Sequence, residues 1–218
     1  MCFEHFAELV KQNKLVFDEL WLRKCLAVNI QYGFDSVTRG KLNELQSIIL
    51  QKTGESLLVC PPESLHISIA FILNVKDNRY IDKENTWNEI REECFVKLEN
   101  IACEQHAISI SFNKLVATDS AVIVVAPDSG EINELRRRIK QIEPIGKWAR
   151  NNAEIVHTTL FRYKEKLKAP QIFQEKLTGC VVNIPLVIKR YDVIKELRYP
   201  SIETEVLGSF AFKGYNGA

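Results

Sequence analysis

The chain has 218 residues, a formal net charge of +1 and 46% hydrophobic residues. This length predicts a single domain over residues 1–218, built from two packed lobes, with enough apolar material for a core that needs no disulfides. The balanced charge argues against a broad basic surface for nucleic acid and against a polybasic membrane anchor. A small basic pocket is still compatible with this composition.

The six cysteines are far apart and mostly lie in apolar runs, without the C-x-x-C pair of a zinc or redox site. They predict buried, reduced thiols. The N-terminal region carries acidic side chains and no apolar signal segment, and no run of about eighteen apolar residues occurs anywhere. We therefore expect a monomeric cytoplasmic protein with no membrane partner.

The first half of the chain predicts an N-terminal helical extension over residues 1–20, followed by a strand at 25–32. Ser36 is expected to cap a helix that Gly54 terminates, because apolar residues recur between them at helical spacing. A strand with alternating apolar residues follows at 65–72.

The later elements predict an α+β protein of two sheet-and-helix lobes with much antiparallel pairing. A doubly wound parallel sheet is the alternative, but no Gly-rich phosphate loop follows a strand. In chain order these elements are an amphipathic helix around 87–101, strands at 107–117 and 121–127, a helix opened by Asp128 and Glu131, a strand at 155–163, a short helix at 171–177, and strands at 181–197 and 209–213.

Two of the four histidines stand in matching surroundings. His66 and His157 each lie in a strand-like apolar frame, with Ser68 and Thr159 two residues later. Because strand side chains alternate with period two, each motif presents an imidazole and a hydroxyl on one face. The arrangement predicts an internal duplication whose halves face each other across a cleft.

Such a pair suits phosphodiester chemistry. One imidazole takes a proton from the attacking hydroxyl or water, and the other gives a proton to the leaving oxygen. The two hydroxyls donate hydrogen bonds to the non-bridging phosphate oxygens, and no metal is required. A single His-x-Ser or His-x-Thr in a strand is usually only a polar outward face, but two in matching frames favour the functional interpretation.

Residues 64–72 and 155–162 resemble the two histidine motifs of the 2H phosphoesterase superfamily, especially its LigT-like branch of RNA 2′,3′-cyclic phosphodiesterases and 2′,5′-RNA ligases. The strand at 121–125 and the helix through Leu135 resemble the elements that usually precede the second motif. The likeness covers nearly the whole chain.

The resemblance implies a bilobal, duplicated fold with His66 and His157 as the catalytic pair at the floor of a cleft. It implies that Ser68 and Thr159 bind the phosphate, although Ser68 stands where Thr is commoner in the family. It further implies a nucleotide or RNA-end substrate, with no metal and no other cofactor. Residues 1–20 and 199–208 match no part of the family and are candidates for shaping the substrate mouth.

Residues after the second motif are secondary candidates for substrate binding. Arg162 resembles the Arg common there and could clamp a phosphate, but strict alternation places it on the face opposite His157. Phe161 and Tyr163 share the face of His157, where Tyr163 could stack on a base. Phe71 has the opposite parity to its own histidine and is expected in the core.

A second group of candidates is basic. The triplet 136–138 consists of three arginines, which fan out around a helix and predict mainly a solvated face. Lys147, Trp148 and Arg150 precede the second motif, where either a nucleic-acid strand or a plain surface loop is possible.

The sequence thus predicts a metal-independent phosphodiesterase that hydrolyses 2′,3′-cyclic phosphates or 2′,5′-phosphodiester bonds by paired-histidine acid–base catalysis. The alternative is a non-catalytic module that holds a nucleotide or an RNA end in the same cleft. A structural protein is a third possibility, which a large distance between the two histidines would support. Which histidine acts as the base is left open.

Overall fold

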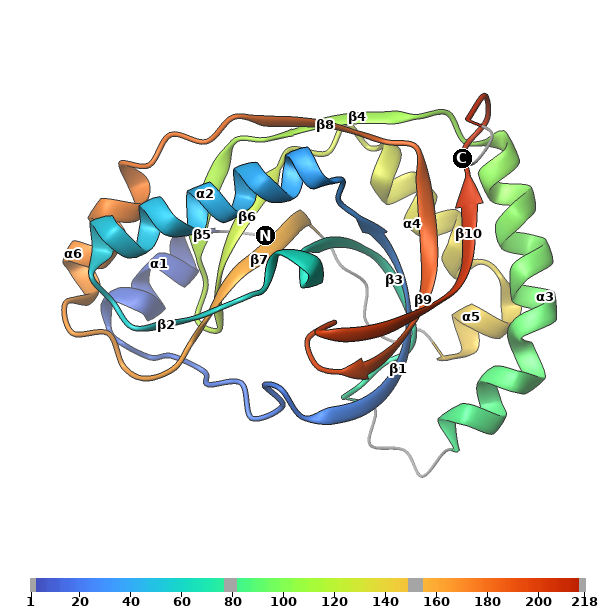
Figure 1. Cartoon of the computed structure of the whole chain (residues 1–218), viewed down its shortest axis with the longest axis horizontal. Coiled ribbons are helices and arrows are strands. Elements are labelled where there is room, and N and C mark those ends of the chain that lie inside the picture. The colour runs from blue at the N-terminus through green and yellow to red at the C-terminus, as the bar shows by residue number, and fades with distance from the viewer. Residues whose placement is uncertain (1–2, 77–81, 149–154, 216–218) are drawn as a thin grey trace.

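A computed structural model describes residues 3–76, 82–148 and 155–215 (Figure 1). Its strands form two four-stranded sheets and one separate two-stranded ladder, with antiparallel pairing throughout the described ladders. The first sheet has the order β10 (Glu203–Ala211), β9 (Arg190–Arg198), β1 (Lys24–Gly33) and β3 (His66–Leu73). The second has the order β2 (Leu57–Val59), β7 (Val156–Tyr163), β6 (Ala121–Ala126) and β5 (Lys114–Ala117). The ladder pairs β4 (Ile108–Phe112) with β8 (Ile184–Ile188).

Each sheet carries its helices on the side away from the other sheet (Figure 1). The first sheet packs against α3 (Lys83–Glu104), α4 (Glu131–Lys140) and α5 (Glu143–Trp148). The second packs against α1 (Phe3–Lys11), α2 (Ser36–Thr53) and α6 (Pro170–Thr178). α2 precedes β3 in the sequence but contacts β7, whereas α4 and α5 precede β7 but contact β3. The chain therefore passes repeatedly between the lobes, which ties them together, and the mixed helices and antiparallel sheets confirm the predicted α+β architecture.

The apolar periodicity of α2 explains its place. Leu42, Leu45 and Ile49 are buried on one face, and Gly54 ends the helix in the left-handed conformation with φ 67°. The N-cap is Asp35 rather than Ser36, because the Asp35 carboxylate accepts a hydrogen bond from the Thr38 amide at 2.7 Å.

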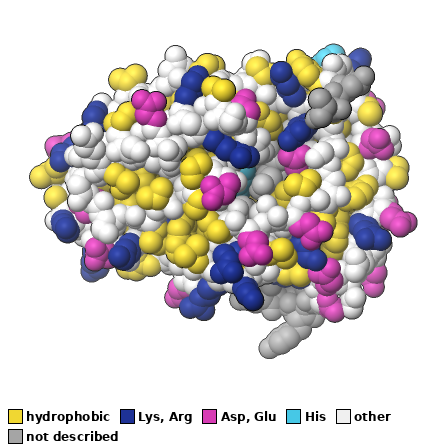
Figure 2. All heavy atoms as spheres, viewed as in Figure 1, with side chains coloured by type: hydrophobic (Ala, Val, Ile, Leu, Met, Phe, Trp, Pro, Cys, Tyr) yellow, Lys and Arg dark blue, Asp and Glu magenta, His cyan; other side chains and the backbone are white. Residues whose placement is uncertain are grey.

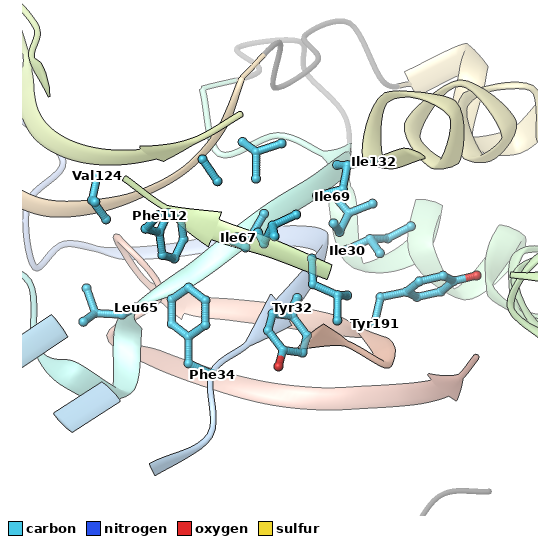
Figure 3. Close-up of a cluster of buried hydrophobic side chains, with 14 of the residues drawn as sticks. Ile30, Tyr32, Phe34, Leu65, Ile67, Ile69, Phe112, Val124, Ile132 and Tyr191 are labelled. Carbon is cyan, nitrogen blue, oxygen red and sulfur yellow. The ribbon is translucent and has the colours of Figure 1, made fainter. Parts of the chain in front are cut away.

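A hydrophobic cluster behind β3 fixes the direction of the first histidine motif (Figure 3). Leu65, Ile67 and Ile69 are at most 1% exposed and belong to this cluster. Since strand side chains alternate, His66 and Ser68 face the other way, toward the second sheet. Burying an aliphatic side chain of this size contributes about 1.5–3 kcal/mol, so a slip in register would be costly.

Three predicted elements differ in their bounds. The N-terminal helix ends at Lys11, shortly before Asn13 takes a positive φ of 53°, and the rest of the N-terminal segment is not helical. The predicted strand at 107–117 is two strands, because the chain leaves its pairing with β8 and joins β6 at Asn113. The last strand starts earlier than predicted, at Glu203.

The described residues bear on two expectations from the sequence, the lack of a membrane-spanning segment and the burial of the cysteines. No helix in this part of the chain is both long and apolar enough to cross a membrane. The five cysteines in these ranges are free thiols; Cys60 and Cys94 are buried as expected, but Cys103 is exposed. The expectation of uniformly buried thiols is therefore wrong for Cys103.

Candidate functional site

A cavity of about 210 Å³ lies where the two histidine strands meet. Both predicted motifs line it, together with Asn29, Glu196 and the turn at 199–201. In the space-filling view, a histidine side chain is visible at the bottom of a hollow near the middle of the face (Figure 2). The structure thus brings the two histidines to one cavity, which removes the observation that would have supported a purely structural protein.

His66 is held in one orientation by its own chain. Its Nδ1 lies 2.8 Å from the carbonyl oxygen of Ser64, at the end of the 3-10 turn Pro62–Ser64. A carbonyl can only accept, so Nδ1 carries a proton and Nε2 is the free nitrogen of the neutral ring. Nε2 lies 3.2 Å from Ser68 Oγ, on the cavity side of β3.

His157 repeats this arrangement in the second sheet. Its Nδ1 lies 3.2 Å from the carbonyl oxygen of Ile155, again two residues before the histidine. Nδ1 is therefore the protonated nitrogen of the neutral ring, and Nε2 is left for a ligand. Both motifs fix their imidazoles by the same backbone contact, as expected for a duplication.

The two hydroxyls lie on the histidine faces, as the alternation predicted. Ser68 and Thr159 are both half-buried and both line the cavity. Ser68 is close enough to donate its hydroxyl hydrogen to His66 Nε2. This contact was not foreseen, because the sequence offered no base dedicated to the serine.

A bulge follows each hydroxyl and reverses the alternation. In β3, Ser68 and Ala70 pair with successive residues of β1, so Ile69 is the extra residue. In β7, Thr159 and Phe161 pair with successive residues of β6, so Leu160 is the extra residue. A bulge puts one additional residue on one strand and turns the following side chains to the other face.

The bulges bring Phe71 and Arg162 into the cavity, five residues after their respective histidines. The prediction that Phe71 is a core residue is wrong, since it is half-buried and lines the cavity. For Arg162, the bulge supplies the inward turn that strict alternation forbade.

The side chain of Tyr163, in contrast, is buried away from the cavity. Its side chain is 1% exposed and its hydroxyl donates to the Thr118 carbonyl oxygen at 2.9 Å. It does not line the cavity, so the predicted contact with a substrate is wrong. The physical reason is the bulge at Leu160, which the residue alternation cannot reveal. Phe161 is fully buried, as its core interpretation required.

Arg162 is held loosely. Its side chain is 18% exposed, its Nε lies 3.5 Å from the Asp18 carboxylate, and one terminal nitrogen donates to the Tyr199 hydroxyl at 3.4 Å. Nε makes no hydrogen bond within the described residues. A guanidinium has five N–H donors, so this one retains the capacity to bind an anion.

Arg136 connects the two motifs, a role that the sequence did not predict. One of its terminal nitrogens donates to the Ser68 carbonyl at 2.9 Å and to the Ile155 carbonyl at 3.2 Å. The Ile155 oxygen is also the one that holds His157. Arg136 is 5% exposed, so the predicted solvated face is wrong for this member of the triplet. Its neighbours Arg137 and Arg138 do form surface ion pairs.

Two candidates from the segment before the second motif, Lys147 and Trp148, do not line the cavity. Lys147 and Trp148 belong to α5 rather than to a loop, and the Lys147 ammonium lies over the Trp148 ring. Arg150 lies outside the described residues.

Burial sets the titration of both histidines. Desolvation lowers the pKa of His66 to about 4, with a smaller lowering by His157, against a raising hydrogen bond to Ser64. Desolvation also lowers the pKa of His157, assisted by the positive charges of Arg136 and Arg162. Both imidazoles are therefore neutral at pH 7 in the free protein.

Further lining of the cavity comes from β1 and β9, which follow β3 in the order of the first sheet. The Glu196 carboxylate accepts from Asn29 Nδ2 at 3.1 Å and from the Ser201 amide at 2.6 Å. Burial raises the pKa of Glu196 in spite of these donors. No sequence motif marks these residues, because the strands that carry them meet only in the folded protein. Within the described residues, no group of three or more His, Cys, Asp or Glu side chains is placed to hold a metal ion.

Comparison with known proteins supports the fold. No family model and no curated protein sequence match the chain. The crystal structure of TT0787 from Thermus thermophilus is similar with a TM-score of 0.61 at 14% identity, over 87% of this chain and 100% of that one. E. coli LigT in its apo form matches with a TM-score of 0.61 at 10% identity, and its complex with 3′-AMP with 0.61 at 8%; each match covers 87% of this chain and 99% of that one. The chain therefore has the LigT-like 2H phosphoesterase fold, as the sequence resemblance implied.

Proposed function

We propose that the protein is a metal-independent phosphodiesterase that cleaves 2′,3′-cyclic phosphates or 2′,5′-phosphodiester bonds of nucleotides or RNA. The observation that carries the proposal is the pair of fixed imidazoles in one shared cavity, each with Nδ1 held by a backbone carbonyl, so that Nε2 is the unprotonated nitrogen. The fold agrees with this proposal, and E. coli LigT has been crystallised with 3′-AMP and with phosphate.

The reaction on a cyclic phosphate needs two proton transfers. The base takes a proton from water, whose oxygen forms a new bond to phosphorus while the bond to one ribose oxygen breaks. The acid gives its proton to that ribose oxygen, and the product is a nucleoside monophosphate. In a 2′,5′-linked substrate the neighbouring 3′-hydroxyl can replace water as the attacking group.

The roles of the two histidines follow from their surroundings. The larger lowering of pKa falls on His66, so its neutral form is the more strongly favoured. We assign the base to His66 and the acid to His157. A phosphodiester bound between them carries a negative charge, which favours a proton on the acid in the complex.

The remaining residues stabilise the phosphate. Ser68 and Thr159 donate hydrogen bonds to its non-bridging oxygens, and Arg162 adds a charged donor from the end of the second motif. Phe71 offers an apolar wall to one nucleoside. Ser68 leaves His66 Nε2 when the phosphate arrives, because its hydroxyl has one proton to donate.

The test is direct. Purified protein is incubated in EDTA with adenosine 2′,3′-cyclic phosphate and with 2′,5′-linked oligoadenylate, and the products are separated by chromatography. Turnover of either substrate supports the proposal. Binding without turnover of both would instead identify a nucleotide-binding module, and activity that disappears on chelation and returns with zinc or manganese would indicate metal-assisted chemistry.

A further inference from the structure

A second hollow, of about 510 Å³, adjoins the cavity that holds the histidines. It is lined by residues 16–20 of the N-terminal segment and by Val75, Lys76, Ser120 and Arg162. Arg162 lines both spaces, so the two meet at this residue. The N-terminal segment thus shapes the surroundings of the site, although it lies outside the duplicated motifs.

This segment is fixed in place rather than loosely attached. The Val16 amide donates to the Asp119 carbonyl at 2.8 Å, and the Leu22 amide donates to the Tyr199 carbonyl at 2.9 Å. Between these points the Asp18 carboxylate, 8% exposed, pairs with Arg162. The segment is therefore anchored on both sides of the hollow and at its junction with the cavity.

The hollow offers an aromatic face and little net charge. Phe17 is 43% exposed and Val16 is 55% exposed. Within the described residues, no aromatic ring is recorded against Phe17. Asp18 is paired with Arg162, and the remaining charges of the hollow, Glu19 and Lys76, are opposite in sign. Such a surface fits an uncharged aromatic group better than a phosphate.

We propose that this hollow receives the second nucleoside of an oligonucleotide, with its base stacked on Phe17. The inference rests on the proposed function and narrows its substrate class to a phosphodiester flanked by a nucleoside on each side. The scissile phosphate lies between the histidines, with one nucleoside toward Phe71 and the other beyond Arg162. Arg162, at the junction, then donates to the phosphate from the side of the second nucleoside.

The experiment compares kcat/KM for adenosine 2′,3′-cyclic phosphate, which has one nucleoside, with that for 2′,5′-linked and 3′,5′-linked diadenosine. Phe17→Leu keeps an apolar side chain but removes the aromatic face. It should lower kcat/KM for the cleaved dinucleotide by about 5- to 150-fold, the range of one base-stacking contact, and leave the cyclic mononucleotide unchanged. Phe17→Trp should retain the dinucleotide activity. Val96→Ala, at a residue that is 60% exposed on α3, is the control for an exposed apolar truncation elsewhere.

The outcomes separate this inference from the function on which it rests. Cleavage of the cyclic mononucleotide but of neither dinucleotide overturns the hollow's role and leaves the proposed function standing. An equal effect of Phe17→Leu on both substrate classes also overturns it. If wild-type protein cleaves nothing, the proposed function fails, and equilibrium binding of 2′,5′-diadenosine decides the inference: an affinity that Phe17→Leu leaves unchanged refutes it.

Discussion

Replacing Arg136 by Met should separate the positioning of the histidines from the stability of the fold. The substitution keeps a long apolar side chain but removes the donors to the Ser68 and Ile155 carbonyls. Hydrogen bonds from a charged donor contribute about 1.5–3 kcal/mol each, so the two together contribute about 3–6 kcal/mol. The cost of burying the guanidinium offsets part of this stabilisation.

The effect of burial on the pKa of the Arg136 guanidinium indicates the size of that cost. Desolvation lowers the pKa of Arg136 to about 10, and the charge of Asp128 opposes only part of this effect. The fall corresponds to about 3 kcal/mol of disfavoured charge. The net loss of stability on Arg136→Met is therefore at most about 3 kcal/mol, and the variant should fold.

A loss of catalytic rate should accompany this loss of stability. Without Arg136, nothing else in the described residues joins the Ser68 carbonyl to the carbonyl that orients His157. A displacement of about 1 Å at a reacting group can cost about a hundredfold in rate. The pKa of His157 should rise as well, because a positive neighbour is removed while the lowering by burial remains.

The assay measures kcat, the pH profile of kcat/KM and the urea unfolding midpoint for Arg136→Met. Arg137→Met is the matched control, since Arg137 lies on the same helix with a side chain that is 56% exposed and pairs with Glu134. A folded Arg136→Met variant with the kcat and pH profile of the wild type would refute the positioning role. A loss of activity shared equally by Arg137→Met would attribute the effect to the helix as a whole.

The remaining predictions concern the hydroxyls, the pH dependence and the roles of the histidines. Ser68→Ala and Thr159→Ala should each cost about 1.5–3 kcal/mol of transition-state stabilisation, or about ten- to 150-fold in rate, while Ser68→Thr should keep most activity. A phosphate adduct on Ser68, detected by mass spectrometry, would instead make this residue a nucleophile. The optimum of kcat/KM should lie on the acid side of 6.5, because His157 must be protonated and burial lowers its pKa, while His66 is lost as a base only near 4. The pKa of His66 is lower in the folded protein than in the unfolded chain, so between these two values the unfolded chain binds more protons. The free energy of unfolding should therefore fall as the pH drops from 6.5 toward 4, as measured by urea titrations at several pH values. A diester with a p-nitrophenol leaving group needs no acid, so its cleavage should survive His157→Ala but not His66→Ala; the opposite pattern would exchange the two roles.

The sequence was sufficient to predict the elements that depend on local patterns. The stripes of α2 and of the helix near Asp128 follow from apolar spacing, and the apolar residues on these stripes are buried as expected. The histidine motifs were found because each fits into three residues of one strand. Such signals are carried by neighbouring residues and need no knowledge of the partner strand.

The errors arise where a distant strand decides the outcome. Phe71, Arg162 and Tyr163 were placed by strict alternation, and the extra residue in each strand reverses it. Neither bulge contains a glycine or proline, the residues that would have indicated a bulge from the sequence. A repeated burial pattern after the two histidines reveals the bulges only once the structure is known.

Arg136 and Asp18 illustrate a second limit. Arg136 is one of three consecutive arginines, and helix geometry alone could not show that its face meets the backbone of both motifs. Asp18 belongs to a segment predicted to be helical, and its pairing with Arg162 depends on the path of the chain after Lys11. Contacts between segments that are remote in sequence set both positions.

The central claim is that His66 and His157 act as one acid–base unit on a single phosphate. Its most direct test is the turnover of His66→Ala, His157→Ala and the double variant on a 2′,3′-cyclic or 2′,5′-linked substrate that the wild type cleaves, because its ribose leaving oxygen needs a proton; folding is checked by circular dichroism. Each single variant should lose at least about a hundredfold, and the double variant should be hardly worse, because either loss already removes the concerted step. A single variant that retains wild-type turnover, or two losses that multiply in the double variant, would contradict the paired mechanism.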